Sequence, residues 1–230
     1  MYVLHYAPDN ASLVIRLALE EIGAPFRTLL VDRSLRAQDS AAYRAVTPTG
    51  LIPALETPQG PVFETAAILL WLAETHGALA PQPGSPERGA FLKWLFFTSN
   101  TLHADMRLHL YPENHAGSEA GLPGFRAAVA TRLLRHLGLL EAMARARPHW
   151  FSPGQPSVLT CYLPCLLRWL ALYPDDRQGW FDLGQFPALQ AVTIAMETRP
   201  AALAAAKAEG LGPTIFSAPQ PPNPPEGSVY

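Results

Sequence analysis

Hydrophobic and polar residues in the first third of the chain alternate between strand-like and helix-like spacing. Apolar residues recur at every second position in the strand-like stretches and at every third or fourth position in the helix-like ones. Glycines end two of the helix-like stretches, as is typical of helix C-termini. The expected elements run in the order βαβαββα, over 2–7, 10–23, 26–32, 40–46, 52–57, 61–64 and 65–77. The first three form a βαβ unit with a right-handed crossover.

A different pattern follows residues 78–89, which are rich in proline, glycine and serine and which we interpret as a linker. Residues 1–77 then form a first domain, and an all-helical second domain is expected over 90–212, because every later periodic stretch is helical. The remaining residues, 213–230, form a proline-rich tail, and its last stretch, 217–230, is expected to be flexible or polyproline-like. The expected helices of the second domain lie within 86–111, 124–146, 157–173, 186–198 and 201–210.

The composition excludes several classes of protein. Hydrophobic residues make up 49% of the chain and charged residues 16%, which is typical of a globular protein. The net charge of -2 gives no electrostatic reason to expect nucleic acid or an anionic membrane as a partner. No apolar run reaches the roughly 18 residues that a membrane-spanning helix needs, and the first ten residues lack the basic region of a signal peptide.

The two cysteines, Cys161 and Cys165, lie four residues apart in one apolar helical stretch. Two thiols on one helix face can bind a metal, but no His or Cys pair lies nearby in the sequence. We therefore expect buried core side chains, with neither a disulfide nor a metal site, in a protein of the reducing cytoplasm.

Three segments together resemble the cytosolic glutathione transferase family. They are "TPTGLIPAL", "FETAAILLWLAETHG" and "FPALQAVTIAMETRPAALAAAKAEG", and they occur in the family's order and spacing. "YAPDNASL" and "WLFFTSNTLH" further resemble the bacterial beta class, where the first of these reads Y-S-P-G-A-C-S-L. The resemblance implies an α/β thioredoxin-like N-terminal domain followed by an all-α C-terminal domain. It also implies a homodimer that uses glutathione as co-substrate, without a metal, and transfers it to a small hydrophobic electrophile.

A proline stands among the apolar residues of the strand expected over 52–57, although proline cannot donate to a sheet ladder. In the family the proline at the position of Pro53 is cis and begins its strand. The backbone N–H and C=O of Ile52 then face an unpaired edge, to which the cysteinyl unit of glutathione can add as an extended strand. The alternative is that Pro53 ends a turn.

The resemblance places the two ends of glutathione near charged residues. Glu64 and Thr65 stand where a strand is followed by a helix, and Thr65 is a good N-cap. The first-turn N–H groups favour the γ-glutamyl carboxylate, and the adjacent acid engages the amino group. Arg33 or Arg36 is the candidate partner of the glycyl carboxylate. The alternatives are an ordinary helix cap with a solvated acid, and surface arginines.

The catalytic position departs from the beta-class pattern, because Ala11 stands where that class has a cysteine. Without this thiol, a hydrogen-bond donor near the first helix is expected to stabilise the glutathione thiolate. Ser12 is the first candidate, and Asn10 and Tyr6 are its rivals; His103 corresponds to a beta-class histidine that faces the thiol. Their alternative roles are an N-terminal cap or first-turn position for Ser12, core packing for Tyr6 and a helix-surface position for His103.

Aromatic residues of the second domain are candidates for an apolar substrate pocket or for core packing: Trp94, Phe97, Tyr111 and Trp169. The segment "SVLTCYL" resembles a family helix start that has an acid at the position of Thr160, so the capping pair with Ser157 is expected to be weakened.

Three hypotheses follow from these residues. The first is a transferase that conjugates glutathione to an electrophile. The second is another glutathione-dependent reaction, namely disulfide reduction, peroxide reduction or isomerisation. The third is a non-catalytic binding protein with the same fold.

Overall fold

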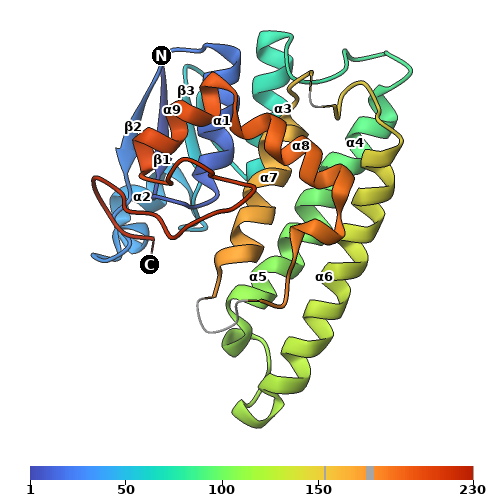
Figure 1. Cartoon of the computed structure of the whole chain (residues 1–230). Helices are drawn as coiled ribbons and strands as arrows, with labels where there is room; N and C mark the ends of the chain where they lie inside the picture. Colours follow the sequence, from blue (N-terminus) through green and yellow to red (C-terminus); the bar gives the residue numbers. More distant parts are fainter. Residues whose placement is uncertain (153, 175–178, 230) are drawn as a thin grey trace.

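The computed structural model describes residues 1–152, 154–174 and 179–229, and it divides into a sheet-containing part and a helical part (Figure 1). The sheet has four strands in the order β2-β1-β3-β4. β1 and β2 are parallel, whereas β3 is antiparallel to both β1 and β4. The elements of this part are β1 (Tyr2–Tyr6), α1 (Ser12–Ile22), β2 (Phe26–Leu30), α2 (Ala41–Val46), β3 (Ala54–Thr57), β4 (Gly60–Phe63) and α3 (Thr65–His76).

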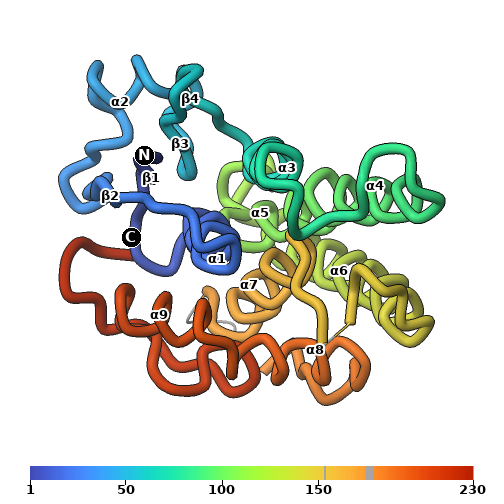
Figure 2. Tube along the Cα trace, turned by 90° about the horizontal axis from the view of Figure 1, so that it is seen from above, coloured from blue at the N-terminus to red at the C-terminus, as the bar shows by residue number. Residues whose placement is uncertain are grey.

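The order βαβαββα predicted from the hydrophobic pattern is confirmed. α1 and α3 pack together on one face of the sheet and α2 covers the other (Figure 2). α1 ends where predicted, because Gly23 takes the left-handed conformation with φ 71° and its N–H bonds back to the last turn. Under α2, a small separate core forms from Val31, Tyr43 and Ala54.

The second part is all-helical, as predicted. Its helices are α4 (Arg88–Phe97), α5 (Ala104–Leu110), α6 (Leu122–Arg145), α7 (Val158–Leu172), α8 (Pro187–Glu197) and α9 (Pro200–Glu209). α7 is almost wholly buried and packs against α1 and α8, so the two parts share one continuous apolar core. Within the described residues, no helix has the length and apolar character required to cross a membrane.

The start of α7 corrects one expectation. Ser157 Oγ accepts a hydrogen bond from the N–H of Thr160 (3.3 Å), and Thr160 Oγ1 accepts one from the N–H of Ser157 (2.8 Å). The reciprocal capping pair is therefore complete, because the threonine hydroxyl replaces the acid as the acceptor.

The proline-rich tail is packed against the protein, so its described residues are not the free segment that was one of the two expectations for 217–230. Ile215 and Phe216 are buried, and the Glu197 carboxylate accepts hydrogen bonds from the backbone N–H groups of Phe216 and Ser217, both at 3.0 Å. The N–H of Asn223 donates to the carbonyl of Gly210 at the end of α9 (2.8 Å), and the tail then returns to the sheet-containing part, where Arg33 donates to the carbonyl of Val229 (Figure 1).

Candidate functional site

A cavity of about 980 Å³ lies where the sheet-containing part meets the helical part. Its first wall consists of the loop from β1 to α1, the segment before β3 and the start of α3, and its second wall comes from α5, α7 and the residues just before α5. Of the ten residues proposed from the sequence, seven line it: Asn10, Arg33, Ile52, Pro53, Glu64, Thr65 and His103. The other three, Tyr6, Ser12 and Arg36, do not.

The Ile52–Pro53 bond is cis, as predicted. Pairing of β3 with β1 begins only at Ala54, opposite His5. Ile52 and Pro53 therefore precede the paired part of the strand and contribute to the cavity wall. This arrangement leaves the backbone of Ile52 and Pro53 outside the strand pairing, at the edge of the cavity.

The start of α3 forms the adjoining wall. Thr65 is the first helical residue and Glu64 occupies the N-cap position, so the expectation that Thr65 would be the cap is wrong by one residue. No side chain caps this end of the helix, and first-turn N–H groups have no partner within a helix. Glu64 has φ 72°, a left-handed conformation that costs a non-glycine residue about 1–3 kcal/mol. The result is an uncapped helix end in the cavity wall beside an exposed carboxylate.

Ser12 cannot serve as the donor proposed for it in this structure. Its side chain is fully buried, its hydroxyl donates to the carbonyl of Ala7 (3.1 Å), and it accepts from the N–H of Ala7 (3.3 Å). The hydroxyl therefore joins the end of β1 to the start of α1 and is directed away from the cavity. Ser12 is the first residue of α1 and follows the N-cap residue Ala11, so the alternative of a first-turn position describes it better.

Tyr6 and Arg36 also lie outside the cavity. The Tyr6 hydroxyl donates to the carboxylate of Glu226 in the tail, and burial together with this carboxylate raises the pKa of Tyr6. Arg36 is exposed and forms an ion pair with Asp39 at 2.7 Å. Both fit the alternatives of core packing and a surface arginine.

His103 lies at the end of a π-helical turn, Thr98–His103, between α4 and α5. Such turns occur often at functional sites, because the extra residue re-aims the side chains around it. His103 Nδ1 lies 2.6 Å from the Tyr162 hydroxyl, and Nε2 has no hydrogen-bond partner among the described residues. Burial, with a smaller effect from the positive charge of Arg107, lowers the pKa of His103 to about 4. The imidazole is therefore neutral at physiological pH, with one nitrogen available to the cavity.

Asn10 and Arg33 line the cavity from the sheet-containing part. Asn10 Oδ1 accepts from the N–H of Ala11 (2.8 Å), and its amide nitrogen has no partner among the described residues. Arg33 donates to the carbonyl of Val229 (2.6 Å) and, at 3.4 Å, to the hydroxyl of Tyr111. The tail thus reaches the cavity rim, and Arg33 holds it there through an uncharged acceptor.

The sequence reasoning missed a buried hydrogen-bond network beside the cavity, centred on Asp9. The buried Asp9 carboxylate accepts two hydrogen bonds from Arg168 and one from Trp169, each at 2.8 Å, and one from the Tyr173 hydroxyl at 2.6 Å. Asp9 has φ 49° and stands where the beta-class pattern has glycine, and that departure was the available signal. Its N–H donates to Glu209, which is paired with Arg16 at 2.7 Å. This network fixes the β1–α1 loop to the helical part.

The two cysteines are free and buried in α7, and neither lines the cavity. Burial raises the pKa of each thiol, so both are inert packing groups, as predicted. Among the described residues, no group of three or more His, Cys, Asp or Glu side chains is arranged to hold a metal ion.

Of the four aromatics named from the sequence, Tyr111 and Trp169 line the cavity, whereas Trp94 and Phe97 pack against the core.

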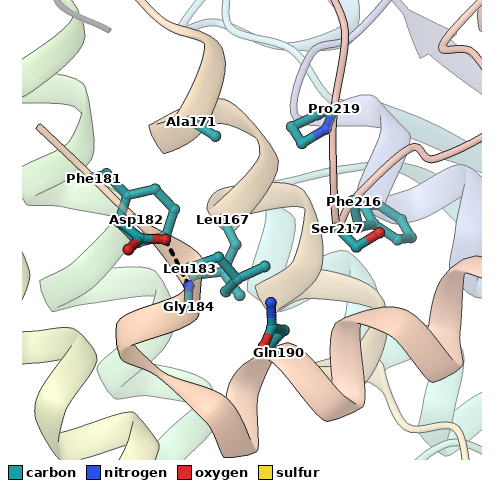
Figure 3. Close-up of a pocket in the computed structure, with 10 residues that line it drawn as sticks. All are labelled: Leu167, Ala171, Phe181, Asp182, Leu183, Gly184, Gln190, Phe216, Ser217 and Pro219. Carbon is teal, nitrogen blue, oxygen red and sulfur yellow. Dashed lines mark hydrogen bonds between the residues drawn. The ribbon is translucent and has the colours of Figure 1, made fainter. Parts of the chain in front are cut away.

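A second cavity of about 210 Å³ lies between α7, α8 and the tail (Figure 3). Two of its polar side chains are already used within the protein. Asp182 accepts from the N–H of Gly184 (2.8 Å), and Ser217 donates to Glu197 (2.5 Å). It contains none of the residues singled out from the sequence, and the larger cavity is the candidate site.

Comparison with known proteins agrees with this geometry. Residues 11–75 match the family model of the glutathione S-transferase N-terminal domain. A sphingomonad glutathione S-transferase, solved in complex with glutathione, is 33% identical, with 91% of this chain and 100% of that chain covered and a TM-score of 0.74. A bacterial beta class glutathione S-transferase from Sphingomonas chungbukensis is 30% identical over 90% of this chain and 98% of that one, with a TM-score of 0.72.

Among curated proteins, the disulfide-bond oxidoreductase YfcG of Escherichia coli K12 is 28% identical over 212 residues, which span 87% of this chain and 92% of that protein. The chain belongs to the glutathione transferase family, and its resemblance extends over nearly all of its length.

Proposed function

We propose that the 980 Å³ cavity binds glutathione and that the protein transfers its thiolate to a small hydrophobic electrophile. The observation that carries this proposal is the convergence on one cavity of the cis Ile52–Pro53 segment, the uncapped start of α3 and His103. Each suits a different part of the tripeptide, and solved relatives over 30% identical include one in complex with glutathione.

The tripeptide backbone is assigned to the first wall. Thr65 and the first turn of α3 receive the γ-glutamyl carboxylate, because helix N–H groups and the helix dipole favour an anion. Glu64 takes the adjacent ammonium. Ile52 pairs with the cysteinyl unit through its backbone, and Arg33 receives the glycyl carboxylate in place of the Val229 carbonyl.

His103 is proposed as the group that stabilises the thiolate. A neutral imidazole that accepts the Tyr162 proton at Nδ1 carries its own proton at Nε2 and donates it toward the cavity. A thiolate is favoured over the thiol when such a donor is present, and one pKa unit corresponds to about 1.4 kcal/mol. Asn10 is the second candidate donor, whereas Ser12 and Tyr6 are no longer proposed.

The electrophile is assigned to the wall from α5 and α7, where Met106, Leu110, Tyr111 and Trp169 present apolar surface. The thiolate sulfur attacks the electrophilic carbon, and the leaving group takes the electron pair of the broken bond. Positioning the two reactants and stabilising the thiolate supply the rate enhancement.

Calorimetry with glutathione, followed by a conjugation assay with 1-chloro-2,4-dinitrobenzene, tests the proposal. Binding and conjugation are both expected. Binding without conjugation of this or any related aryl halide refutes the transferase activity, and absence of binding refutes the site.

Glutathione-dependent disulfide reduction is a second candidate, because one relative that covers most of the chain is a disulfide-bond oxidoreductase. The two cysteines lie outside the cavity, so two glutathione molecules would supply both electrons and become glutathione disulfide. Reduction of 2-hydroxyethyl disulfide, coupled to glutathione reductase, measures this activity beside the conjugation rate.

The family resemblance also supports a cytoplasmic homodimer as a proposal, and the two free cysteines agree with a reducing compartment.

A further inference from the structure

Arg107 on α5 lines the cavity without an ionic partner. It is exposed, and its side chain makes no hydrogen bond or ion pair with any other described residue. His103, Arg107 and Tyr111 are spaced four residues apart, and all three line the cavity, so one side of this helical segment faces it. The positive charge of Arg107 contributes to the lowered pKa of His103, which places the guanidinium within electrostatic range of the imidazole.

The other charged groups of the cavity already have a counterpart. Asp9 is held by Arg168. In the proposed function Glu64 is matched by the glutathione ammonium, the start of α3 by one carboxylate and Arg33 by the other. Arg107 then remains as a cation on the wall assigned to the electrophile, beside Met106 and Leu110.

We infer that the preferred electrophile carries a carboxylate, which Arg107 binds, beside an apolar or aromatic body. The guanidinium is planar and matches a carboxylate through two parallel hydrogen bonds. The apolar neighbours of Arg107 accommodate the remainder of the substrate. This inference rests on the proposed function, and it narrows the substrate class from any hydrophobic electrophile to an anionic one.

The test compares two glutathione conjugates that differ in one group. S-(4-carboxy-2,6-dinitrophenyl)glutathione and S-(4-carbamoyl-2,6-dinitrophenyl)glutathione have the same shape, but only the first has the extra negative charge. Their dissociation constants are measured by calorimetry, and kcat/KM is measured for the parent 4-chloro-3,5-dinitrobenzoate and its carboxamide. In both reactions the thiolate forms the carbon–sulfur bond and chloride leaves. Because the carboxamide withdraws more electron density from the ring than the carboxylate, each kcat/KM is divided by the rate constant of the uncatalysed reaction with glutathione before the two are compared.

We expect the wild type to bind the carboxylate conjugate about tenfold more tightly than the carboxamide, a difference of about 1.4 kcal/mol. Arg107→Gln should remove this preference and leave carboxamide binding within twofold of the wild type. Arg107→Lys should retain part of it, because lysine keeps the charge but not the paired geometry. Arg135→Gln removes the same charge from an exposed position on α6 outside the cavity, and it should change neither conjugate.

Equal wild-type affinity for the two conjugates overturns the inference and leaves the proposed function intact. The same holds if Arg107→Gln weakens both conjugates alike, because Arg107 then acts on glutathione itself. If neither conjugate binds, the proposed glutathione site is wrong and the inference fails with it.

Discussion

Asp9→Asn is the most informative change outside the proposed chemistry. Asparagine has the same shape as aspartate and tolerates the left-handed conformation that Asp9 adopts at φ 49°, so the change isolates the charge. The carboxylate accepts four hydrogen bonds, and its side chain and that of Arg168 are both fully buried. The substitution leaves the Arg168 charge buried without a counter-ion and directs an N–H₂ group at donors.

Removing one partner of such a buried pair costs about 3–5 kcal/mol. We therefore expect Asp9→Asn to lower the free energy of unfolding by that amount, measured by urea denaturation with an unchanged m value. Asp39→Asn is the matched control. Asp39 also bonds two arginines, Arg36 and Arg44, but it is exposed, so Asp39→Asn should leave the free energy of unfolding nearly unchanged.

In an Arg168→Met background, Asp9→Asn should cost much less than it does alone, because the buried cation is then absent. A loss below about 1 kcal/mol for Asp9→Asn alone would refute the view that this network holds the β1–α1 loop to the helical part.

Four further predictions follow. The free energy of unfolding should fall as the pH drops from about 7 to 4, because the pKa of His103 is near 6.5 in the unfolded chain and about 4 in the folded protein. In urea titrations over that interval, the free energy of unfolding of His103→Gln should fall by about 3 kcal/mol less than that of the wild type. Equal losses would contradict this assignment. Glu64→Ala and Thr65→Ala should each weaken glutathione binding about tenfold by calorimetry at unchanged circular dichroism, and wild-type affinity in both would remove the γ-glutamyl assignment. Ser12→Ala should lower the free energy of unfolding by about 1–3 kcal/mol, because it leaves the Ala7 N–H unpaired. The midpoint of the pH–rate profile of conjugation should not change, and a shifted midpoint would restore Ser12 to the site. Light scattering at micromolar concentration should give twice the chain mass of 25.0 kDa, and a monomer mass would end the homodimer proposal.

Features that depend on neighbouring residues were predictable from the sequence. The element order follows from local periodicity, and the cis bond before Pro53 follows from a short motif. The cavity residues after β1, before β3 and after β4 were also predictable, because each follows or precedes a strand that local periodicity locates and the fold brings these strand ends together. Their placement required no knowledge of long-range packing.

Features that depend on distant contacts were not predictable. The four hydrogen bonds to Asp9 come from residues at least 159 positions away, in a helix whose alignment against α1 no local pattern encodes. Ser12 was misassigned because the direction of a first-turn hydroxyl depends on the path of the preceding loop, which turns it toward Ala7. Residues 217–230 were expected to be flexible or polyproline-like because they are polar and proline-rich, yet Arg168 and Arg33 donate to the carbonyls of Gln220 and Val229 and hold the tail against the protein.

The central claim is that one cavity binds glutathione and presents its sulfur to His103. A crystal structure of the protein with bound glutathione tests this most directly. The account predicts the γ-glutamyl end at Glu64 and Thr65, the cysteinyl backbone paired with Ile52, and the sulfur within hydrogen-bond distance of His103 Nε2. Glutathione bound elsewhere on the protein, or its sulfur directed away from His103, would contradict the account.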